Sequence, residues 1–223
     1  MGFDINYMLE LMPILLKYLS TTMEMAILGL IFSTILAVII ANIRVFKIPV
    51  LDQLSQLYIS FFRGTPLLVQ LFLFYYGLPQ IFPIFVGLDA FSAAVIGLAL
   101  HFAAYMAETI RAAIIGIDRS QMEASLSIGM TTSQAMRRII LPQASRVALP
   151  SMMNYFIDMI KSTSLAFTFG VAEIMAKAQM EAASSFRFFE AFLAVALIYW
   201  VIVVLLTQVQ NRVEIRLNKA YQR

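Results

Sequence analysis

The residues best suited to chemistry in this sequence form a polar stripe inside an apolar segment that runs from about Val147 to Phe169. At about 100° per residue, five polar side chains of this segment fall within roughly a third of the circumference of a helix. In a segment long enough to cross a membrane, polar residues are costly to insert and mark candidate functional sites. The stripe comprises Ser151, Asn154, Asp158, Lys161 and Ser162.

Two interpretations of the stripe remain open. Asp158 and Lys161 lie one helical turn apart, so they can neutralise each other and leave the stripe as polar packing between helices. Alternatively, the stripe lines a water-filled cavity and offers one carboxylate and one ammonium group to a zwitterionic solute. The hydroxyl residues that follow Lys161 can meet a carboxylate: Ser162, Thr163 and Ser164. Thr163 and Ser164 point to other faces of a regular helix, so all of these residues serve one site only if the helix unwinds.

Arg63 and His101 are further candidates. Arg63 stands just before Gly64 and Pro66, which should break a helix and free backbone groups that can also bind a ligand. Arg63 can equally extend to the cytoplasmic surface. His101 is the single histidine and has small neighbours, so we expect a hydrogen-bonding residue at a helix interface and not a proton relay.

The composition shows what must position these residues. The chain has 223 residues, of which 61% are hydrophobic and 13% charged, and its mean hydropathy is +0.83. A soluble domain carries about a quarter charged residues, so this is an all-α integral membrane protein. It has no cysteine and one histidine, which excludes cysteine nucleophiles and makes metal sites built from several such residues unavailable. We find no catalytic constellation and predict no enzyme activity of its own.

Five apolar stretches approach the roughly 20 residues needed to cross a bilayer. The second is interrupted between residues 63 and 66, where we expect a bend. The connection at 79–89 has no basic residue and is expected to be a tight turn. The predicted spans are Met25–Ile43, Leu54–Leu78, Ala90–Ala107, Val147–Phe169 and Ala191–Gln210.

Basic residues lie mainly on one side of these spans, and the positive-inside rule makes that side cytoplasmic. The N-terminus is therefore predicted outside and the C-terminus in the cytoplasm. The net charge of +3 reflects this topology and not binding to nucleic acid. The eleven cytoplasmic basic residues are Arg44, Lys47, Arg111, Arg119, Arg137, Arg138, Arg146, Arg212, Arg216, Lys219 and Arg223, against Lys17, Lys177 and Arg187 outside, with Arg63 and Lys161 at membrane depth.

The chain is predicted to be a single transmembrane domain, residues 1–223. Residues 1–20 form either an external amphipathic helix at the membrane interface or a simple extension of the first span. A cytoplasmic loop covers residues 112–146, and a cytoplasmic tail covers residues 211–223. Five spans cannot be divided into equal inverted halves, so a pore is expected to need two copies.

The polar stretch Ser120–Pro142 is predicted to form a hairpin of two short helices. Ser120 with Glu123, and Thr131 with Gln134, have the spacing of capping boxes. Gly129 is placed to end the first helix, and Pro142 to end the second. Two interpretations remain open, a plain connector and a docking element, and Arg137 and Arg138 fit either a topology signal or a partner contact. No GxxxxGK[ST] phosphate loop occurs, so any energy must come from a partner or a gradient.

These residues resemble the permease subunits of bacterial ABC importers. Glu123-Ala124, Gly129, Ile139, Leu141 and Pro142 are similar to the EAA motif of that family, with nine residues between the glycine and the isoleucine. The match to its polar amino-acid subfamily covers nearly the whole chain and includes Arg63-Gly64-Thr65-Pro66-Leu67, Tyr105 with Glu108 and Arg111, and Lys161 to Leu165.

The resemblance implies the type I importer permease fold, with five transmembrane helices and a cytoplasmic coupling-helix hairpin, in a bacterial inner membrane. It implies a second permease copy or homologue, two ABC ATPase subunits that hold ATP and Mg²⁺, and an extracytoplasmic substrate-binding protein. The permease would bind no cofactor directly. The implied residues are, for ATPase coupling, Glu123, Ala124, Gly129, Ile139, Leu141 and Pro142, and, for the substrate pathway, Arg63, Asn154, Asp158, Lys161, Ser162, Thr163 and Ser164.

Two positions depart from the family pattern. Ser125 replaces the second alanine of EAA, and Ser162 stands where many amino-acid permeases have Asp. The resulting KSTSL resembles the cystine-type members, so cystine is the first expected solute. The alternative function is a gradient-driven transporter or channel that works without an ATPase.

Overall fold

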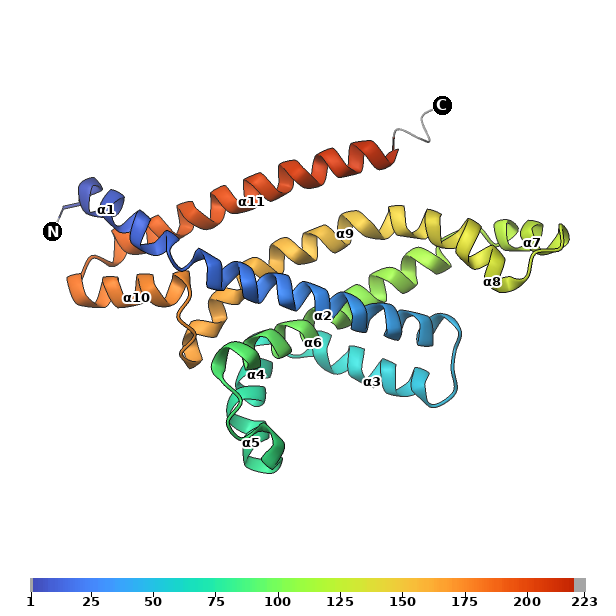
Figure 1. Ribbon diagram of the computed structural model, residues 1–223, viewed down its shortest axis with the longest axis horizontal. Coiled ribbons are helices and arrows are strands. Elements are labelled where there is room, and N and C mark those ends of the chain that lie inside the picture. The colour runs from blue at the N-terminus through green and yellow to red at the C-terminus, as the bar shows by residue number, and fades with distance from the viewer. Residues whose placement is uncertain (1, 219–223) are drawn as a thin grey trace.

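The computed structural model describes residues 2–218, and every regular element in that range is helical, which confirms the all-α prediction. Figure 1 shows an elongated bundle with α1 and α10 at one end and a hairpin of α7 and α8 at the other. The α-helices are α1 (Ile5–Leu16), α2 (Leu19–Val45), α3 (Leu51–Gly64), α4 (Leu67–Phe72), α5 (Leu78–Ile81), α6 (Ala90–Ile115), α7 (Arg119–Ser127), α8 (Thr132–Ala135), α9 (Leu141–Ser162), α10 (Ile174–Ser185) and α11 (Phe188–Asn218). The π segments are η1 (Leu73–Gly77) and η3 (Met136–Ile140), and the 3₁₀ segments are η2 (Pro83–Phe85) and η4 (Thr163–Phe169).

Among the described residues, three helices are long and apolar enough to cross a bilayer, namely α2, α6 and α11. A fourth span results if α3 and the helical stretch 67–81 count as one broken helix, bent by 111°. Helix α9 has 22 residues but carries the polar stripe, so composition alone does not mark it as a span. The predicted tail 211–223 continues α11 as far as residue 218, and residues 219–223 lie outside the described range.

The predicted bend in the second span is present and sharp. Thr65 has φ −122° and ψ 147°, and Pro66 has φ −64° and ψ 138°, so both are extended. The ring of Pro66 disfavours the helical region for the residue before it, which ends α3 at Gly64. The chain then restarts as α4 after the bend of 111°.

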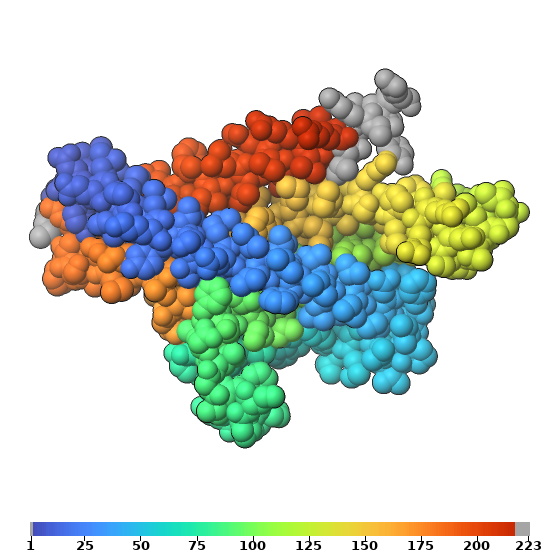
Figure 2. Space-filling model, viewed as in Figure 1, coloured from blue at the N-terminus to red at the C-terminus, as the bar shows by residue number. Residues whose placement is uncertain are grey.

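The segment after α4 forms an arm that leaves the bundle and stands out from its lower side in Figures 1 and 2. The prediction of a tight turn at 79–89 is wrong, because α5 and η2 occupy much of it. Pro83 lies in the first turn of η2, where a missing amide costs no hydrogen bond. Pro79 follows the wide turn of η1 within the continuous helical run 67–81. The arm exposes large apolar side chains, including Ile81, Ile84 and Val86.

Helices α2 and α6 pack along each other to form the centre of the bundle. Their contact is built from small side chains, which let two helix backbones approach closely in a membrane. A Cβ atom at Gly97 of α6 would lie 2.5 Å from the Leu71 side chain, so glycine there lets α4 reach α6. The small buried residues in this region are Ala37, Ala103, Ala104 and Ala107.

The first helix of the hairpin begins earlier than predicted. Asp118 is its N-cap, and its carboxylate accepts a hydrogen bond of 2.9 Å from the Ser120 amide. The capping box at Ser120 and Glu123 is therefore wrong, because an equally good acceptor stands two residues upstream. The second box is confirmed, since Thr131 Oγ1 accepts from the Gln134 amide at 3.3 Å and Gln134 Oε1 from the Thr131 amide at 2.9 Å.

The second helix of the hairpin does not end at Pro142, contrary to prediction. Helix α8 continues through η3 directly into α9, so the predicted loop 112–146 is mostly helical. At the end of η3, the Leu141 amide donates to the Met136 carbonyl, five residues back. Wide turns of this type accommodate a proline inside a helical run.

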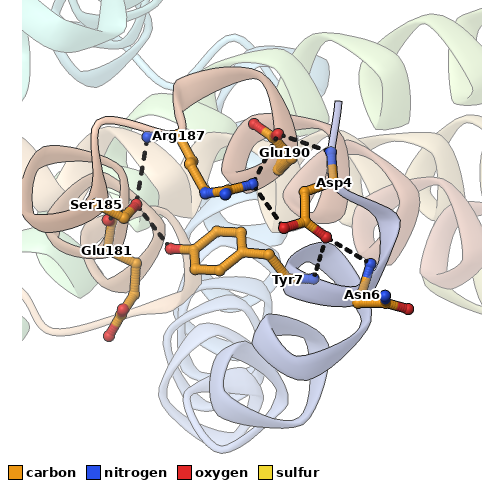
Figure 3. Close-up of polar contacts among 7 residues, drawn as sticks. All are labelled: Asp4, Asn6, Tyr7, Glu181, Ser185, Arg187 and Glu190. Carbon is orange, nitrogen blue, oxygen red and sulfur yellow. Dashed lines mark hydrogen bonds and ion pairs between the residues drawn. The ribbon is translucent and has the colours of Figure 1, made fainter. Parts of the chain in front are cut away.

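At the opposite end, a polar cluster fastens α1 to α10 and α11 (Figure 3). Arg187 Nη1 lies 2.9 Å from Asp4 Oδ2 and 3.5 Å from Glu190 Oε1, and the latter oxygen accepts from the Asp4 amide. The Tyr7 hydroxyl donates to Ser185 Oγ at 2.8 Å. Helix α1 is therefore a separate helix and no extension of the first span. Its buried residues are Met8, Leu11 and Leu15, whereas Leu9 and Leu16 are exposed.

Glu173 is a fully buried carboxylate in the connection before α10. Its Oε1 accepts from the Ala176 amide at 2.8 Å, and its Oε2 accepts from the Tyr199 hydroxyl at 3.3 Å. Burial outweighs these bonds and raises its pKa from 4.5 to about 7. The folded chain therefore binds a proton that the unfolded chain releases at lower pH.

We predict a pH-dependent stability that traces to Glu173. Because its folded pKa is raised, its contribution is greatest below about pH 4.5 and is lost as pH rises towards 7. The thermal midpoint in detergent should fall by roughly 3 °C or more between pH 5 and pH 8. Glu173→Gln should flatten this change, whereas Glu10→Gln, at an exposed carboxylate, should keep it. An equal pH slope in both variants would contradict the assignment.

Candidate functional site

The hairpin presents a compact tip away from the bundle (Figure 1). Glu123, Ala124 and Gly129 are all exposed there. Gly129 has φ +87° and ends α7, with its amide donating to the Leu126 carbonyl. Ile128, which the sequence analysis missed, is 77% exposed beside it. Its signal was an apolar side chain next to the turn glycine of a polar segment, and such a side chain is available for contact with another protein.

The base of the hairpin holds the other motif residues. Ile139 lies in η3, and Leu141 and Pro142 begin α9, so all three belong to one helical run. Ser125, in the position of the second motif alanine, is buried, and its hydroxyl donates to the Gln121 carbonyl at 2.7 Å. Serine therefore packs there without an unsatisfied polar group.

The polar stripe divides into two parts in the structure. Asp158 and Lys161 form the expected ion pair, with 2.6 Å between Oδ1 and Nζ, and each side chain is 53% exposed. Asn154 instead faces α11, where its Oδ1 accepts from Gln210 Nε2 at 3.0 Å. Asn154 thus links α9 to α11 and remains exposed, whereas the ion pair faces away from this chain.

The hydroxyl residues after Lys161 bond to their own helix. Ser162 Oγ donates to the Asp158 carbonyl and Ser164 Oγ to the Lys161 carbonyl, and Thr163 is fully buried and donates to the Ile160 carbonyl. The helix tightens to a 3₁₀ form at Thr163 and does not unwind there, so the sharing of one site by all of these residues stays a prediction. The hydrogen of each hydroxyl is used in these bonds, so each hydroxyl oxygen can still accept a hydrogen bond but cannot donate one to a solute.

Arg63 lies at the end of α3, with its guanidinium carbon 5.4 Å from the centre of the Tyr105 ring on α6. The Tyr105 and Tyr155 rings are 6.1 Å apart, and the Tyr155 hydroxyl lies 2.9 Å from Thr109 Oγ1. Tyr155 precedes Asp158 by one turn of α9. An aromatic path therefore connects Arg63 to the helix that carries the ion pair, although the structure shows no direct contact between them.

The sequence and the fold match known proteins. A family model described as binding-protein-dependent transport system inner membrane component covers residues 29–219. The chain belongs to this family.

Several relatives resemble this permease along its whole length. It is 85% identical to the probable amino-acid ABC transporter permease protein PatM of Vibrio harveyi over 100% of both chains. It is 40% identical to the L-cystine transport system permease protein TcyL of Bacillus subtilis, covering 98% of this chain and 93% of the relative. A crystal structure of an amino acid ABC transporter with histidines has a chain that superposes with a TM-score of 0.90 at 34% identity, covering 97% of this permease and 100% of that chain.

Family membership establishes the general role. The chain is an amino-acid ABC transporter permease, a multi-pass protein of the bacterial inner membrane, and not itself an enzyme. The family carries no bound cofactor, and its members work with ATPase and binding-protein partners. Within residues 2–218, no three His, Asp or Glu side chains gather in a way that could hold a metal ion.

An ion network joins three helices of the permease at the hairpin end. Glu108 and Arg111 lie one helical turn apart, and the Glu108 carboxylate accepts from Arg111 Nε at 2.6 and 2.9 Å. Arg44, at the end of α2, forms an ion pair with Asp52 of α3, with 2.9 Å between Nη1 and Oδ1. Its Nη2 lies 3.8 Å from Glu108 Oε1. The charges balance, so these half-buried groups fasten α2, α3 and α6 to one another and offer no net charge to a solute.

Proposed function

We propose that this permease carries a polar amino acid across the inner membrane as the transmembrane subunit of an ATP-driven type I importer, with five spans including α9. The observation that carries the proposal is the exposed, rigidly turned hairpin in a chain that has no nucleotide loop. A permease that lacks a nucleotide loop and exposes such a hairpin needs an ATPase partner that can bind the hairpin. Full-length similarity to PatM supports the same role.

The hairpin is the proposed coupling element. Its tip would sit in a groove of one of two ATPase subunits, so that their closure on ATP tilts the bundle. The continuous helix from α8 to α9 supports this, because motion at the tip passes directly into the helix that carries the ion pair. The proposed coupling residues are Glu123, Ala124, Gly129, Ile139, Leu141 and Pro142.

The proposed substrate pathway runs along α9 and the break after α3, in a pore completed by a second copy or homologue. The outward-facing, half-exposed ion pair supports this placement. An extracytoplasmic binding protein would deliver the solute to the end that carries α1 and α10. The proposed pathway residues are Arg63, Asn154, Asp158, Lys161, Ser162, Thr163 and Ser164.

We further propose that the N-terminus lies outside and the C-terminus in the cytoplasm. Nine of the eleven basic residues that predict the cytoplasmic side lie within the described range. They cluster around the hairpin and at the ends of α2, α6 and α11 that face it (Figure 1). The positive-inside rule places that end in the cytoplasm, with residues 1–20 external, 112–146 cytoplasmic and 211–223 a cytoplasmic tail.

Cystine is the proposed solute. KSTSL at residues 161–165 resembles the cystine-type pattern, and TcyL is named for L-cystine transport. A neutral Ser162 removes the carboxylate that would favour a cationic solute.

Uptake into proteoliposomes tests the function. The permease is reconstituted with its ATPase and binding-protein partners, and labelled cystine is supplied on the binding-protein side. We expect uptake that requires ATP, fails with a hydrolysis-deficient ATPase and is outcompeted by unlabelled cystine but not by arginine. Uptake that follows an ion gradient without the ATPase would establish the alternative, a gradient-driven transporter. ATP-dependent uptake of another amino acid would overturn only the assignment of cystine as the solute.

A further inference from the structure

The break between α3 and α4 leaves backbone carbonyl groups without their usual partners. In a regular helix, the Phe62 carbonyl would accept from the amide of residue 66, but Pro66 has no amide hydrogen. The Thr65 hydroxyl already donates to the preceding carbonyl, Phe61, at 2.8 Å. At membrane depth, such freed groups must find a partner within the protein.

Gln70 supplies that partner. Its side chain is 1% exposed, and its Nε2 lies 2.9 Å from the Phe62 carbonyl, 3.0 Å from the Thr65 carbonyl and 2.7 Å from Thr65 Oγ1. The amide of one side chain on α4 therefore replaces the missing backbone donor of Pro66 and holds both sides of the break together.

The same side chain also reaches α6. Gln70 Oε1 lies 2.9 Å from His101 Nδ1. The two carbonyls at the break require the NH₂ group on their side, so Oε1 must face His101 and accept, and His101 Nδ1 must carry the hydrogen. The predicted role of His101 as a hydrogen-bonding interface residue is confirmed, and its partner is the residue that seals the break.

Arg63 depends on this arrangement. It lies two residues before Thr65, and its guanidinium stacks on Tyr105, one turn of α6 beyond His101. The His101 and Tyr105 rings are 5.1 Å apart. We call the Gln70 side chain with its bonds to the Phe62 and Thr65 carbonyls and to His101 the Gln70 clamp. The Gln70 clamp and the stacked guanidinium therefore join the same two elements, the end of α3 and the middle of α6.

We propose that Gln70 is a positioning residue of the translocation pathway. Its amide fixes the angle between α3 and α4 and anchors the break to α6, and this keeps Arg63 over Tyr105. The inference rests on the proposed function in one respect, the assignment of Arg63 to the pathway. It assigns a transport role to a residue that touches no solute itself.

The geometric half of the proposal is tested with Gln70→Met, which keeps the side-chain length and removes both hydrogen-bonding groups. The chain has no cysteine, so spin labels can be placed at Leu57 on α3 and Val69 on α4, both well exposed. The distance distribution between the labels should broaden in the Gln70→Met permease. Gln56→Met, which loses only an exposed bond to Asp52, is the matched control and should leave the distribution narrow. An unchanged distance distribution in both variants would overturn the proposal that the Gln70 clamp fixes the angle between α3 and α4.

The functional half is tested by a double-mutant cycle of Gln70→Met with Arg63→Gln in the reconstituted importer. Gln70→Met leaves buried carbonyls unsatisfied and releases the break, and Arg63→Gln removes the guanidinium over Tyr105. Each single variant should therefore lower uptake about tenfold at equal amounts of inserted protein. If Gln70 acts through Arg63, the double variant should be no slower than Arg63→Gln alone. A merely structural role would instead give additive losses, about a hundredfold, and that result would overturn the proposal.

The cycle separates the two levels of inference. Full uptake by Arg63→Gln would refute the pathway assignment of Arg63, whatever Gln70 does. Impaired uptake by Arg63→Gln with additive losses would refute only the positioning role of Gln70.

Discussion

Replacing Gly129 with Leu is expected to abolish solute-stimulated ATP hydrolysis by the assembled importer while leaving the permease inserted in the membrane. Gly129 has φ +87°, and a residue with a Cβ atom loses roughly 1–2 kcal/mol in that conformation. A Cβ there would meet nothing within 4 Å, so the strain is purely in the backbone. The turn should relax by moving the exposed tip, and a coupling surface displaced by even 1 Å no longer fits its groove.

Gly87→Leu is the matched control for this prediction. Gly87 has φ +88° and also has nothing within 4 Å of a built Cβ, but it lies in the connection between η2 and α6, far along the chain from the hairpin. The backbone strain is therefore equal and the location different. The measurement is ATP hydrolysis with solute-loaded binding protein, normalised to inserted permease. Normal stimulation by Gly129→Leu, or equal loss in both variants, would contradict a specific coupling role for the hairpin.

The hairpin shows why local chemistry is predicted better than boundaries. The Thr131–Gln134 box and the turn at Gly129 depend on a few neighbouring residues, and both are confirmed. The first cap was misassigned because Asp118 and Ser120 compete for the same role, and only the path of the chain out of α6 decides between them. Because Asp118 caps α7, Glu123 takes no part in the cap, and its side chain makes no hydrogen bond or ion pair within the described part of the chain. Its exposed carboxylate is therefore available to a partner.

Contacts between residues far apart in the chain could not be predicted from the sequence. The pair Asp158–Lys161 follows from helical spacing and is confirmed, and the pair Glu108–Arg111 has the same spacing. The bond from Gln210 to Asn154 depends on how α11 crosses α9, which no local pattern encodes. Gln70 carried a usable signal, because Pro66 leaves the carbonyl four residues earlier unpaired and a buried amide donor must then lie nearby. Its bond to His101 still required the packing of α4 on α6.

The second large effect is expected at the ion pair of α9. Lys161→Ala and Asp158→Ala should each lower uptake about tenfold or more, because each removes one of the two groups that can bind a zwitterionic solute and leaves the other charge unpaired. Loading of the binding protein should be normal, since that step precedes the permease. The measurement is initial uptake in proteoliposomes at saturating binding protein, with inserted permease quantified in parallel.

Exchanging the two charges distinguishes a solute site from helix packing. Asp158→Lys with Lys161→Asp keeps an ion pair one turn apart, and only a few tenths of a kcal/mol should be lost where Asp replaces Lys in the last turn of α9. If the pair only neutralises itself, the exchanged permease should transport normally. If it orients a zwitterion between carboxylate and ammonium, uptake should stay as low as in the alanine variants, because each end of the solute now meets its own sign of charge. The half-exposed position of both side chains favours the second outcome, since a pair meant only for packing has no reason to face away from the chain.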